Sequence, residues 1–239
     1  MPSPNTSSGS LRTPEGEFPL AEYRLRLGGR EWGILHAGSV LTLEEEQHFL
    51  SELRDLLPYG VALWPAALAL AHDMAARPDA FRGRRVLELG AGTGLPGIVA
   101  ASLGARVVQT DRHELPMGLC RRNGERNGVA GNGAGAGAIE YRLVDWSAWD
   151  DAERYDWILG ADVLYGETGH LDLRRIFDAN LAPGGRLLLS DPFRSASIRL
   201  LEAMEADGWS VAGSRWSVGE AAAGEELRPV GVFELAPPS

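Results

Sequence analysis

Glycines and an acidic residue that could hold a nucleotide-like ligand follow the first predicted buried strand. Glu88 stands near the end of this strand, and Gly90, Gly92 and Gly94 alternate in the turn after it. Glycines allow a tight turn and a ligand lying against the backbone, and the next helix points N–H groups and its positive dipole end at that ligand. Gly92, Gly94 and Gly97 also match the dinucleotide pattern. A carboxylate at Glu88 would repel a pyrophosphate, however, and suits a ligand with a cationic or hydroxyl-bearing part.

Polar and aromatic side chains follow the next three predicted strands. Asp111 stands about 20 residues beyond the glycines, where a carboxylate can accept both ribose hydroxyl protons. Asp145 and Trp146 close the following strand and could contact an adenine ring. Asp162 and Tyr165 close the one after that. Because the carboxyl ends of parallel strands meet along one crevice, we expect Asp162 and Tyr165 beside the reactive end of the ligand.

The elements that must position these residues alternate between strand and helix. Predicted strands cover residues 86–89, 106–110, 139–144, 156–160 and 186–190. Predicted helices lie near residues 97–103, 114–127, 171–181 and 195–206. Helical crossovers imply parallel strands, whereas segments 209–216 and 230–235 are joined without a helix and predict an antiparallel hairpin. The sequence therefore predicts an α/β fold, with a Rossmann-like, doubly wound, mostly parallel seven-stranded sheet that ends in this hairpin.

Smaller elements are predicted before this core. Residues 1–20, rich in Ser, Pro, Gly and Thr, are expected to form a disordered tail. Two short runs, 23–27 and 31–35, flank a pair of glycines, and the first alternates with period two, which predicts a small hairpin. Thr42 is the expected N-cap of an amphipathic helix, and Pro58 ends that helix.

One domain is expected over residues 21–239. Residues 21–80 form its N-terminal extension in this interpretation, and residues 81–239 form its Rossmann-like core. The low-complexity stretch 131–137 is glycine-rich and predicts a flexible surface insertion.

Charge and composition limit the compartment and the partners. Arginine alone supplies the 23 lysine-plus-arginine residues, and 33 acidic residues give a net charge of −10, which disfavours a nucleic-acid-binding face. The single cysteine, Cys120, excludes an internal disulfide and fits a reducing compartment, so we expect a cytoplasmic protein. The longest apolar run, residues 61–71, is too short to span a membrane. The histidines lack ligand spacing, and no metal site is expected.

From Tyr59 to Asp191 the chain resembles the class I, seven-β-strand S-adenosylmethionine-dependent methyltransferases, and within them the protein-lysine methyltransferase group. The residues that carry this resemblance are Glu88-x-Gly90-x-Gly92-x-Gly94, Asp111, Asp145-Trp146, Asp162-x-x-Tyr165 and the upstream Trp64-Pro65. The segment Ser190-Asp191-Pro192-Phe193-Arg194 is similar to the Asp-Pro-x-Arg segment of the electron-transfer-flavoprotein β-subunit lysine methyltransferases.

The resemblance implies S-adenosylmethionine as cofactor and a role for each matching residue. Glu88 would lie near the methionine ammonium, with the three glycines under the cofactor. The residues expected to bind the cofactor are Trp64, Glu88, Gly90, Gly92, Gly94, Asp111, Asp145, Trp146 and Ala161. Asp162 and Tyr165 would face the substrate as the catalytic pair. The expected reaction is in-line methyl transfer to a lysine side chain of a protein, with Asp162 either the base or a positioning group.

Other functions remain open at this point. The same crevice could serve a small-molecule N- or O-methyltransferase acting on an amine or a nicotinamide-like substrate. A nucleic-acid amino-methyltransferase usually has an Asn/Asp-Pro-Pro-aromatic segment after the fourth strand, and Ala161 to Tyr165 contains no proline. A cofactor-binding module without enzymatic activity is a further alternative.

Overall fold

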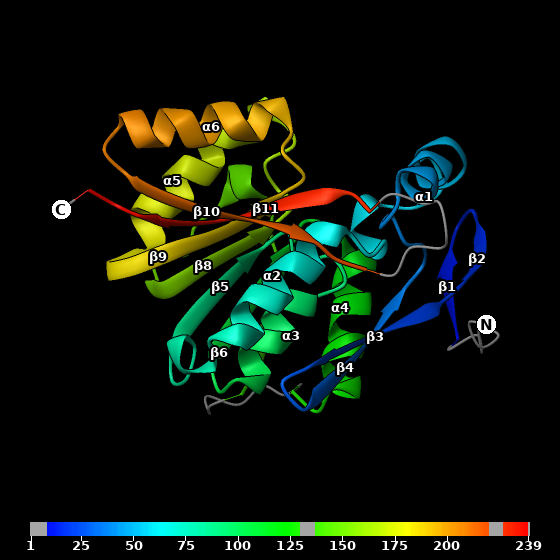
Figure 1. Cartoon of the computed structure of the whole chain (residues 1–239). Helices are drawn as coiled ribbons and strands as arrows, with labels where there is room; N and C mark the ends of the chain where they lie inside the picture. Colours follow the sequence, from blue (N-terminus) through cyan, green and yellow to red (C-terminus); the bar gives the residue numbers. More distant parts are fainter. Residues whose placement is uncertain (1–8, 130–136, 220–226, 239) are drawn as a thin grey trace.

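A twisted seven-stranded sheet crosses the molecule (Figure 1). The structure is a computed structural model and describes residues 9–129, 137–219 and 227–238. The strand order is β10-β11-β9-β8-β5-β6-β7. The strands are β5 (Arg85–Leu89), β6 (Arg106–Asp111), β7 (Ile139–Leu143), β8 (Tyr155–Ala161), β9 (Leu181–Asp191), β10 (Ser210–Ser217) and β11 (Pro229–Ala236). The pairs among β5 to β9 are parallel, and β11 runs antiparallel to β9 and β10. The predicted fold is confirmed.

The order of the strands creates a crevice beside β5. The chain proceeds from β5 outward to β6 and β7, and then returns to place β8 on the opposite side of β5. Loops that leave the carboxyl ends of β5 and β8 therefore run in opposite directions. Ligands bind at such a point in open α/β sheets.

Helices cover both faces of the sheet. They are α2 (Pro65–Ala76), α3 (Leu95–Ser102), α4 (Glu114–Arg126), α5 (His170–Asn180) and α6 (Ser195–Ala206). Figure 1 shows α2, α3 and α4 on one face and α5 and α6 on the other. Strand residues alternate between the two cores, so that Leu188 packs with α2 and α3 while Leu187 and Leu189 pack with α5 and α6. Both cores hold the strand ends of the crevice in place.

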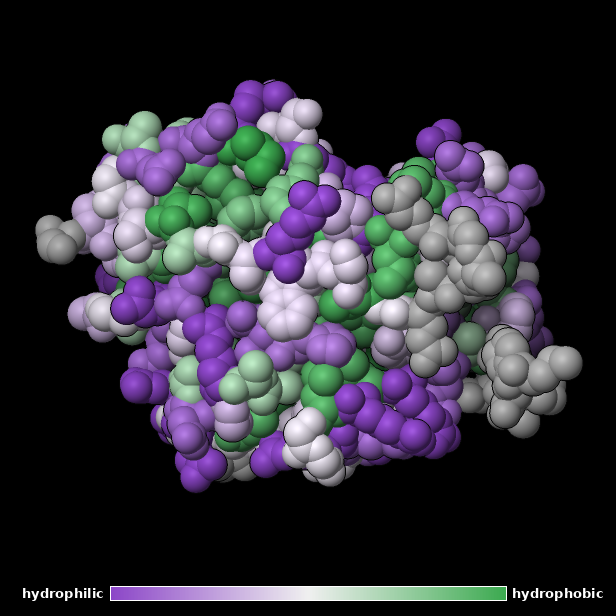
Figure 2. Space-filling model, in the orientation of Figure 1, coloured by the Kyte–Doolittle hydropathy of each residue, from purple (hydrophilic) through white to green (hydrophobic). Residues whose placement is uncertain are grey.

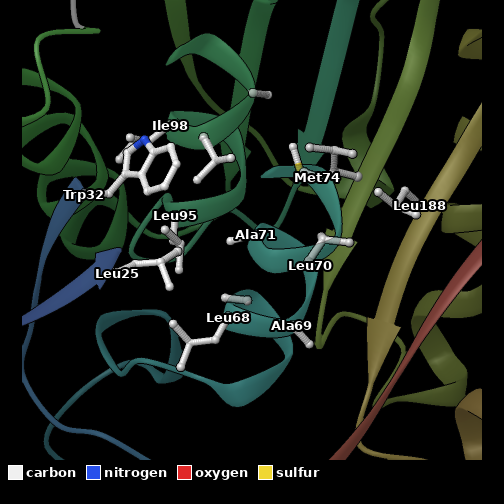
Figure 3. Close-up of a cluster of buried hydrophobic side chains, with 14 of the residues drawn as sticks. Leu25, Trp32, Leu68, Ala69, Leu70, Ala71, Met74, Leu95, Ile98 and Leu188 are labelled. Carbon is white, nitrogen blue, oxygen red and sulfur yellow. The ribbon is translucent and has the colours of Figure 1, made fainter. Parts of the chain in front are cut away.

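The predicted N-terminal hairpin is present as β3 (Ala21–Leu27) and β4 (Arg30–His36). Figure 3 shows Leu25 and Trp32 of this hairpin beside Leu95 and Ile98 of α3, in the same cluster as α2. The Trp32 indole N–H also donates to the Ser102 hydroxyl at 3.0 Å. The hairpin therefore packs on the outer side of the helical layer.

The segment between the hairpin and α2 begins with the helix α1 (Leu43–His48), as Thr42 predicts. Thr42 accepts a hydrogen bond from the Glu45 N–H, and the Glu45 side chain accepts from the Thr42 N–H, which is a capping box. The chain continues as a π-helical turn, Phe49–Leu53, and then as a short 3₁₀ turn, Tyr59–Val61. These turns lie over the end of the sheet that carries the crevice.

The expectation of a disordered tail over residues 1–20 is wrong for its second half. Residues Ser10–Thr13 (β1) and Gly16–Pro19 (β2) pair as an antiparallel hairpin, and Leu11 and Phe18 pack against a small apolar cluster that includes Leu20. The composition of this segment is typical of a disordered tail, but two short strands form because their apolar residues pack on this cluster. The expected flexible insertion at 131–137 lies, apart from Gly137, outside the described residues. Within the described part of the chain, no helix is long and apolar enough to cross a membrane.

Candidate active site

A cavity of about 410 Å³ opens at the carboxyl ends of β5, β6 and β8. In Figure 2 the outline of the molecule is notched between the part that carries α6 and the part that carries α1, and both Glu46 of α1 and Arg194, just before α6, line the cavity. The predicted site residues that line it are Trp64, Gly90, Gly92, Asp111, Asp145, Trp146, Ala161, Asp162 and Tyr165. Glu88 and Gly94 are the two predicted site residues outside this lining. The structure thus brings together side chains from strand ends far apart in sequence.

The glycine turn approaches the cavity at its first residues. Gly90 has a φ of +63°, and a Cβ there would lie 2.9 Å from Cγ1 of Val163 and 3.5 Å from the Trp146 ring. Gly94 faces the other way, because a Cβ on it would lie 2.5 Å from the Cys120 sulfur. Gly90 therefore keeps the cavity open, while Gly94 allows β5 and α3 to pack against α4.

Glu88 lies below the glycine turn and outside the lining of the cavity. Its side chain is 1% exposed, and Oε2 accepts from the Gly97 N–H at 3.0 Å and from the Gln109 amide at 2.5 Å. Strand alternation explains this placement, since Glu88 pairs in register with Gln109 and both point toward α3. Burial raises the pKa of Glu88 to about 8. Glu88 thus holds the start of α3 from below the turn, and its contact with a methionine ammonium stays a prediction.

Asp111 has the geometry expected of a group that binds a ribose. One oxygen accepts from the Gly92 N–H at 3.1 Å, and the other accepts from the His113 N–H at 3.0 Å. Asp111 is buried at the cavity wall, yet each carboxylate oxygen can accept more than one hydrogen bond. The turn and Asp111 hold each other in place and leave acceptors for a pair of hydroxyl groups.

Asp145 and Trp146 form the next part of the wall. Asp145 caps a short 3₁₀ turn by accepting from the Ser147 N–H at 2.9 Å and the Ser147 hydroxyl at 2.7 Å, and these bonds lower the pKa of Asp145. The Trp146 ring lies beside Gly90. An indole and a fixed carboxylate next to a glycine turn suit a flat, amino-bearing ring such as adenine.

Aromatic side chains close the cavity on the side of α1. Trp64 donates its indole N–H to the Tyr59 carbonyl at 2.9 Å, and the two rings lie 6.1 Å apart, centre to centre. Phe49 packs behind both rings. Glu46 and Leu50 also reach the cavity, which the sequence reasoning missed. Helical spacing predicted the amphipathic helix but could not show that one of its faces overhangs the strand ends.

Asp162 is ion-paired in this structure, which the sequence did not predict. Both terminal nitrogens of Arg194 face its carboxylate, and the Nη2 to Oδ2 distance is 3.2 Å. Asp162 has a φ of +57°, and its N–H donates to the Ser190 carbonyl at 2.8 Å. Tyr165 is 58% exposed and stands at the mouth. The catalytic pair proposed from the sequence therefore contains one neutralised carboxylate and one accessible phenol.

The cavity fits S-adenosylmethionine on these observations. Its inner part offers a glycine turn without Cβ atoms, a carboxylate with acceptors to spare and an indole beside that turn. Within the described residues, no group of three or more His, Cys, Asp or Glu side chains is arranged to hold a metal ion.

Known proteins resemble this chain in sequence and in fold. The profile of a family described as lysine methyltransferase matches residues 45–197. Protein N-lysine methyltransferase METTL21A of Xenopus tropicalis is 36% identical over 150 residues, which are 62% of this chain and 68% of that protein. Histone-arginine methyltransferase METTL23 of Xenopus laevis is 34% identical over 151 residues, 60% of each chain. The aligned segments thus span 60–68% of these relatives.

A solved structure supports the fold independently. N-methyltransferase NodS from Bradyrhizobium japonicum, in complex with S-adenosyl-L-homocysteine, superposes with a TM-score of 0.53 at 17% identity, covering 73% of this chain and 85% of that one. At this level of identity the likeness concerns the fold alone. The family profile covers more than half of the chain. The chain therefore belongs to the lysine methyltransferase family of S-adenosylmethionine-dependent enzymes.

Proposed function

We propose that this protein transfers a methyl group from S-adenosylmethionine to the side-chain nitrogen of a lysine in a protein substrate. The observation that supports the proposal is that Gly90, Asp111 and Trp146 line the same cavity as Asp162 and Tyr165. Relatives named for protein lysine methylation include METTL21A and the calmodulin-lysine N-methyltransferase of Arabidopsis thaliana.

The proposed cofactor site consists of the inner residues of the cavity. Asp111 would accept hydrogen bonds from the ribose hydroxyls, and Asp145 with Trp146 would hold the adenine. Gly90 and Gly92 would let the cofactor lie against the backbone, and Ala161 and Trp64 would line its methionine end. Glu88 and Gly94 support this site from behind. We also propose that residues 21–239 act as one catalytic domain, because α1 and the strand ends line the same cavity.

Bound S-adenosylmethionine supplies an electrophilic methyl group, and its sulfur keeps the electron pair of the broken bond. A target lysine must first lose a proton, which at neutral pH costs about 4.6 kcal/mol for a reference pKa of about 10.4. Trp64 and Tyr59 would wall the alkyl stem and exclude water from it. Asp162 would accept a hydrogen bond from the amine and aim its lone pair. The proton would leave to solvent at the mouth, where Tyr165 is exposed.

Labelling of a cell lysate tests this function. Lysate from a strain lacking the enzyme is incubated with protein and S-adenosylmethionine carrying a labelled methyl group. We expect label in one or a few protein bands with the wild type and at least tenfold less with Asp162→Asn, since asparagine tolerates a positive φ. Glu205→Gln, an exposed change on α6, is the matched control and should label as the wild type does.

Other outcomes of the same experiment would replace the proposal. Label confined to the low-mass fraction would indicate a small-molecule methyltransferase, and label in nucleic acid would indicate a nucleic-acid enzyme. Because the relative METTL23 is named for histone arginine methylation, the labelled residue must also be identified.

We also propose that the protein works in a reducing compartment such as the cytoplasm. Cys120 is buried without a second cysteine in the chain, so an oxidising environment would add nothing to its stability. Cell fractionation with a compartment-specific antibody control checks this directly.

A further inference from the structure

We propose that Arg194 is a positioning residue that cancels the charge of Asp162, so that the mouth of the cavity favours a neutral, reactive amine over an ammonium ion. This inference rests on the proposed function and deepens it. It gives Asp162 the task of orienting the amine and not of removing its proton.

The pair of Asp162 and Arg194 has the form of a fork. Nη1 faces Oδ1, and Nη2 lies 3.2 Å from Oδ2, so that the guanidinium meets the carboxylate with two nitrogens. Planar, two-point pairs of this kind are the strong and directional ones. The Asp162 side chain is only 7% exposed, which protects the pair from solvent screening.

The loop before α6 is built to aim the guanidinium at Asp162. Asp191 is fully buried at the end of β9, where it accepts from the Arg194 N–H at 2.7 Å and from the Ser197 hydroxyl at 2.6 Å. Phe193 has a φ of +60° and packs edge-on against Phe233 of β11. A left-handed conformation at a bulky residue is strained and persists only where its surroundings enforce it. The strain here turns the chain so that Arg194 points back to the cavity.

The other charged groups around the mouth leave Asp162 and Arg194 as its central pair. Asp191 lies behind Arg194, 3.5 Å from Nη1, and burial raises its pKa. Glu46 of α1 lines the cavity but is paired with Arg228. The remaining titratable residues of the lining are Asp111, Arg112, His113, Asp145, Tyr59 and Tyr165. The first four belong to the inner, cofactor-like part of the cavity, and Tyr165 is a phenol at the mouth.

An unpaired carboxylate at this place would work against the reaction. An opposite charge within a few ångströms favours the charged form of an amine and raises its pKa by about 1–3 units. Each such unit lowers the neutral fraction about tenfold at a pH below the pKa. With Arg194 in place, Asp162 can still accept a hydrogen bond from the neutral amine through a remaining lone pair. The pair thus still orients the neutral amine through Asp162, but it no longer attracts the ammonium ion.

A first test needs no protein substrate. Ligand-observed NMR measures the affinity of n-butylammonium, a mimic of the lysine side chain, for protein saturated with S-adenosylhomocysteine. We expect Arg194→Gln to bind this cation about tenfold more tightly than the wild type, and Arg194→Lys to stay within about threefold of it. Equal or weaker binding by Arg194→Gln would overturn the proposal.

Asp162→Asn tests the same charge balance by changing the other residue of the ion pair. It leaves Arg194 without its carboxylate, so we expect n-butylammonium to bind about tenfold more weakly than to the wild type. Unchanged binding would mean that the pair does not face the amine. This variant decides the matter if Arg194→Gln fails to fold, as thermal unfolding and S-adenosylhomocysteine affinity will report.

A second test uses the protein substrate found by lysate labelling and follows kcat and KM against pH. Arg194→Gln should lower kcat about tenfold near neutral pH without raising KM, and its deficit should narrow toward pH 10 as the amine deprotonates unaided. Arg194→Lys should restore most of kcat. A deficit equal at every pH would indicate a structural role only and contradict the proposal. If the wild type labels no lysine, the proposed function fails, while the n-butylammonium titration still decides the charge balance.

Discussion

The inner part and the mouth of the cavity hold their acidic residues in different ways. In the inner part, Asp111 and Asp145 accept hydrogen bonds from backbone N–H groups of nearby loops. At the mouth, Asp162 is bound by a guanidinium that comes from beyond the next strand. The inner part therefore holds its carboxylates with backbone N–H groups, whereas at the mouth a guanidinium faces Asp162, and Tyr165 is exposed beside it.

We propose that the difference follows from what each part binds. A cofactor that stays the same from turnover to turnover can be met by fixed acceptors on short loops. A substrate amine changes its charge before it reacts, so the group beside it must not stabilise the wrong form. A carboxylate alone serves the first purpose, and a carboxylate with a partner serves the second.

The largest effect is expected on cofactor affinity, from removing the Asp111 carboxylate. Asp111→Ala should weaken S-adenosylmethionine binding about 100-fold, because each hydrogen bond to a charged group contributes about 1.5–3 kcal/mol and the Gly92 turn loses its support. Isothermal calorimetry measures this. Asp150→Ala, an exposed carboxylate outside the cavity, is the matched control. An affinity for Asp111→Ala within threefold of the wild type would contradict the account of the inner part.

A smaller effect, on the free energy of unfolding, should distinguish Gly94 of the turn from Gly118, a glycine with no close neighbours. Gly94→Ala should destabilise the protein by about 2–3 kcal/mol, because its φ is +85° and the new Cβ meets the Cys120 sulfur. Gly118→Ala in the middle of α4 meets nothing within 4 Å and should stabilise by about 0.5–1 kcal/mol. Urea unfolding measures both. Equal effects at the two positions would refute the distinction.

A third prediction concerns Glu88, which lines neither part of the cavity, and the dependence of stability on pH. Burial raises the pKa of Glu88 from 4.5 to about 8, so the folded protein keeps a proton there that the unfolded chain loses. Stability therefore falls as the pH rises from about 4.5 to about 8, on the order of 2 kcal/mol after allowance for relaxation of the buried site. Glu88→Gln should remove this decline and be more stable than the wild type at the upper end.

Thermal unfolding of both proteins across this pH range measures the difference. S-adenosylmethionine affinity of Glu88→Gln should stay within about threefold of the wild type, since the side chain lies below the turn. A stability difference that does not change with pH would count against the buried proton. A large loss of S-adenosylmethionine affinity in Glu88→Gln would indicate that Glu88 contacts the methionine ammonium.

The smallest effect is expected at the rim. Tyr165→Phe should change KM for the protein substrate less than about twofold, because phenylalanine keeps the aromatic ring and the side chain is 58% exposed. Tyr165→Leu should raise KM more, by about fivefold, since it removes the aromatic face. Steady-state kinetics on the labelled substrate compare them. A large loss of kcat in Tyr165→Phe would assign the phenol a role in proton transfer.

Much of the core could be predicted because its signals are local. Strands bounded by a glycine turn and acidic strand ends lie in continuous stretches, and parallel pairing then places Asp111, Asp145 and Asp162 at one edge. The C-terminal hairpin followed from a connection without a helix. These features depend on neighbours in the chain or on rules of chain connection.

The features that sequence missed depend on contacts between distant segments. The Asp162–Arg194 pair joins the loops that follow β8 and β9, and nothing in either segment alone reveals it. The orientation of Glu88 could have been inferred from Gln109, a polar residue inside a buried strand at the same register. The β1–β2 hairpin packs by tertiary contact and has a composition typical of a tail.

Identification of the methylated residue tests the central claim, that this cavity directs a methyl group from S-adenosylmethionine to a protein lysine. The labelled protein band is digested and its modified peptide is sequenced by mass spectrometry. We expect methyllysine at a defined position, formed by the wild type and at least tenfold less by Asp162→Asn. Methylarginine, or a labelled small molecule with no modified peptide, would contradict it.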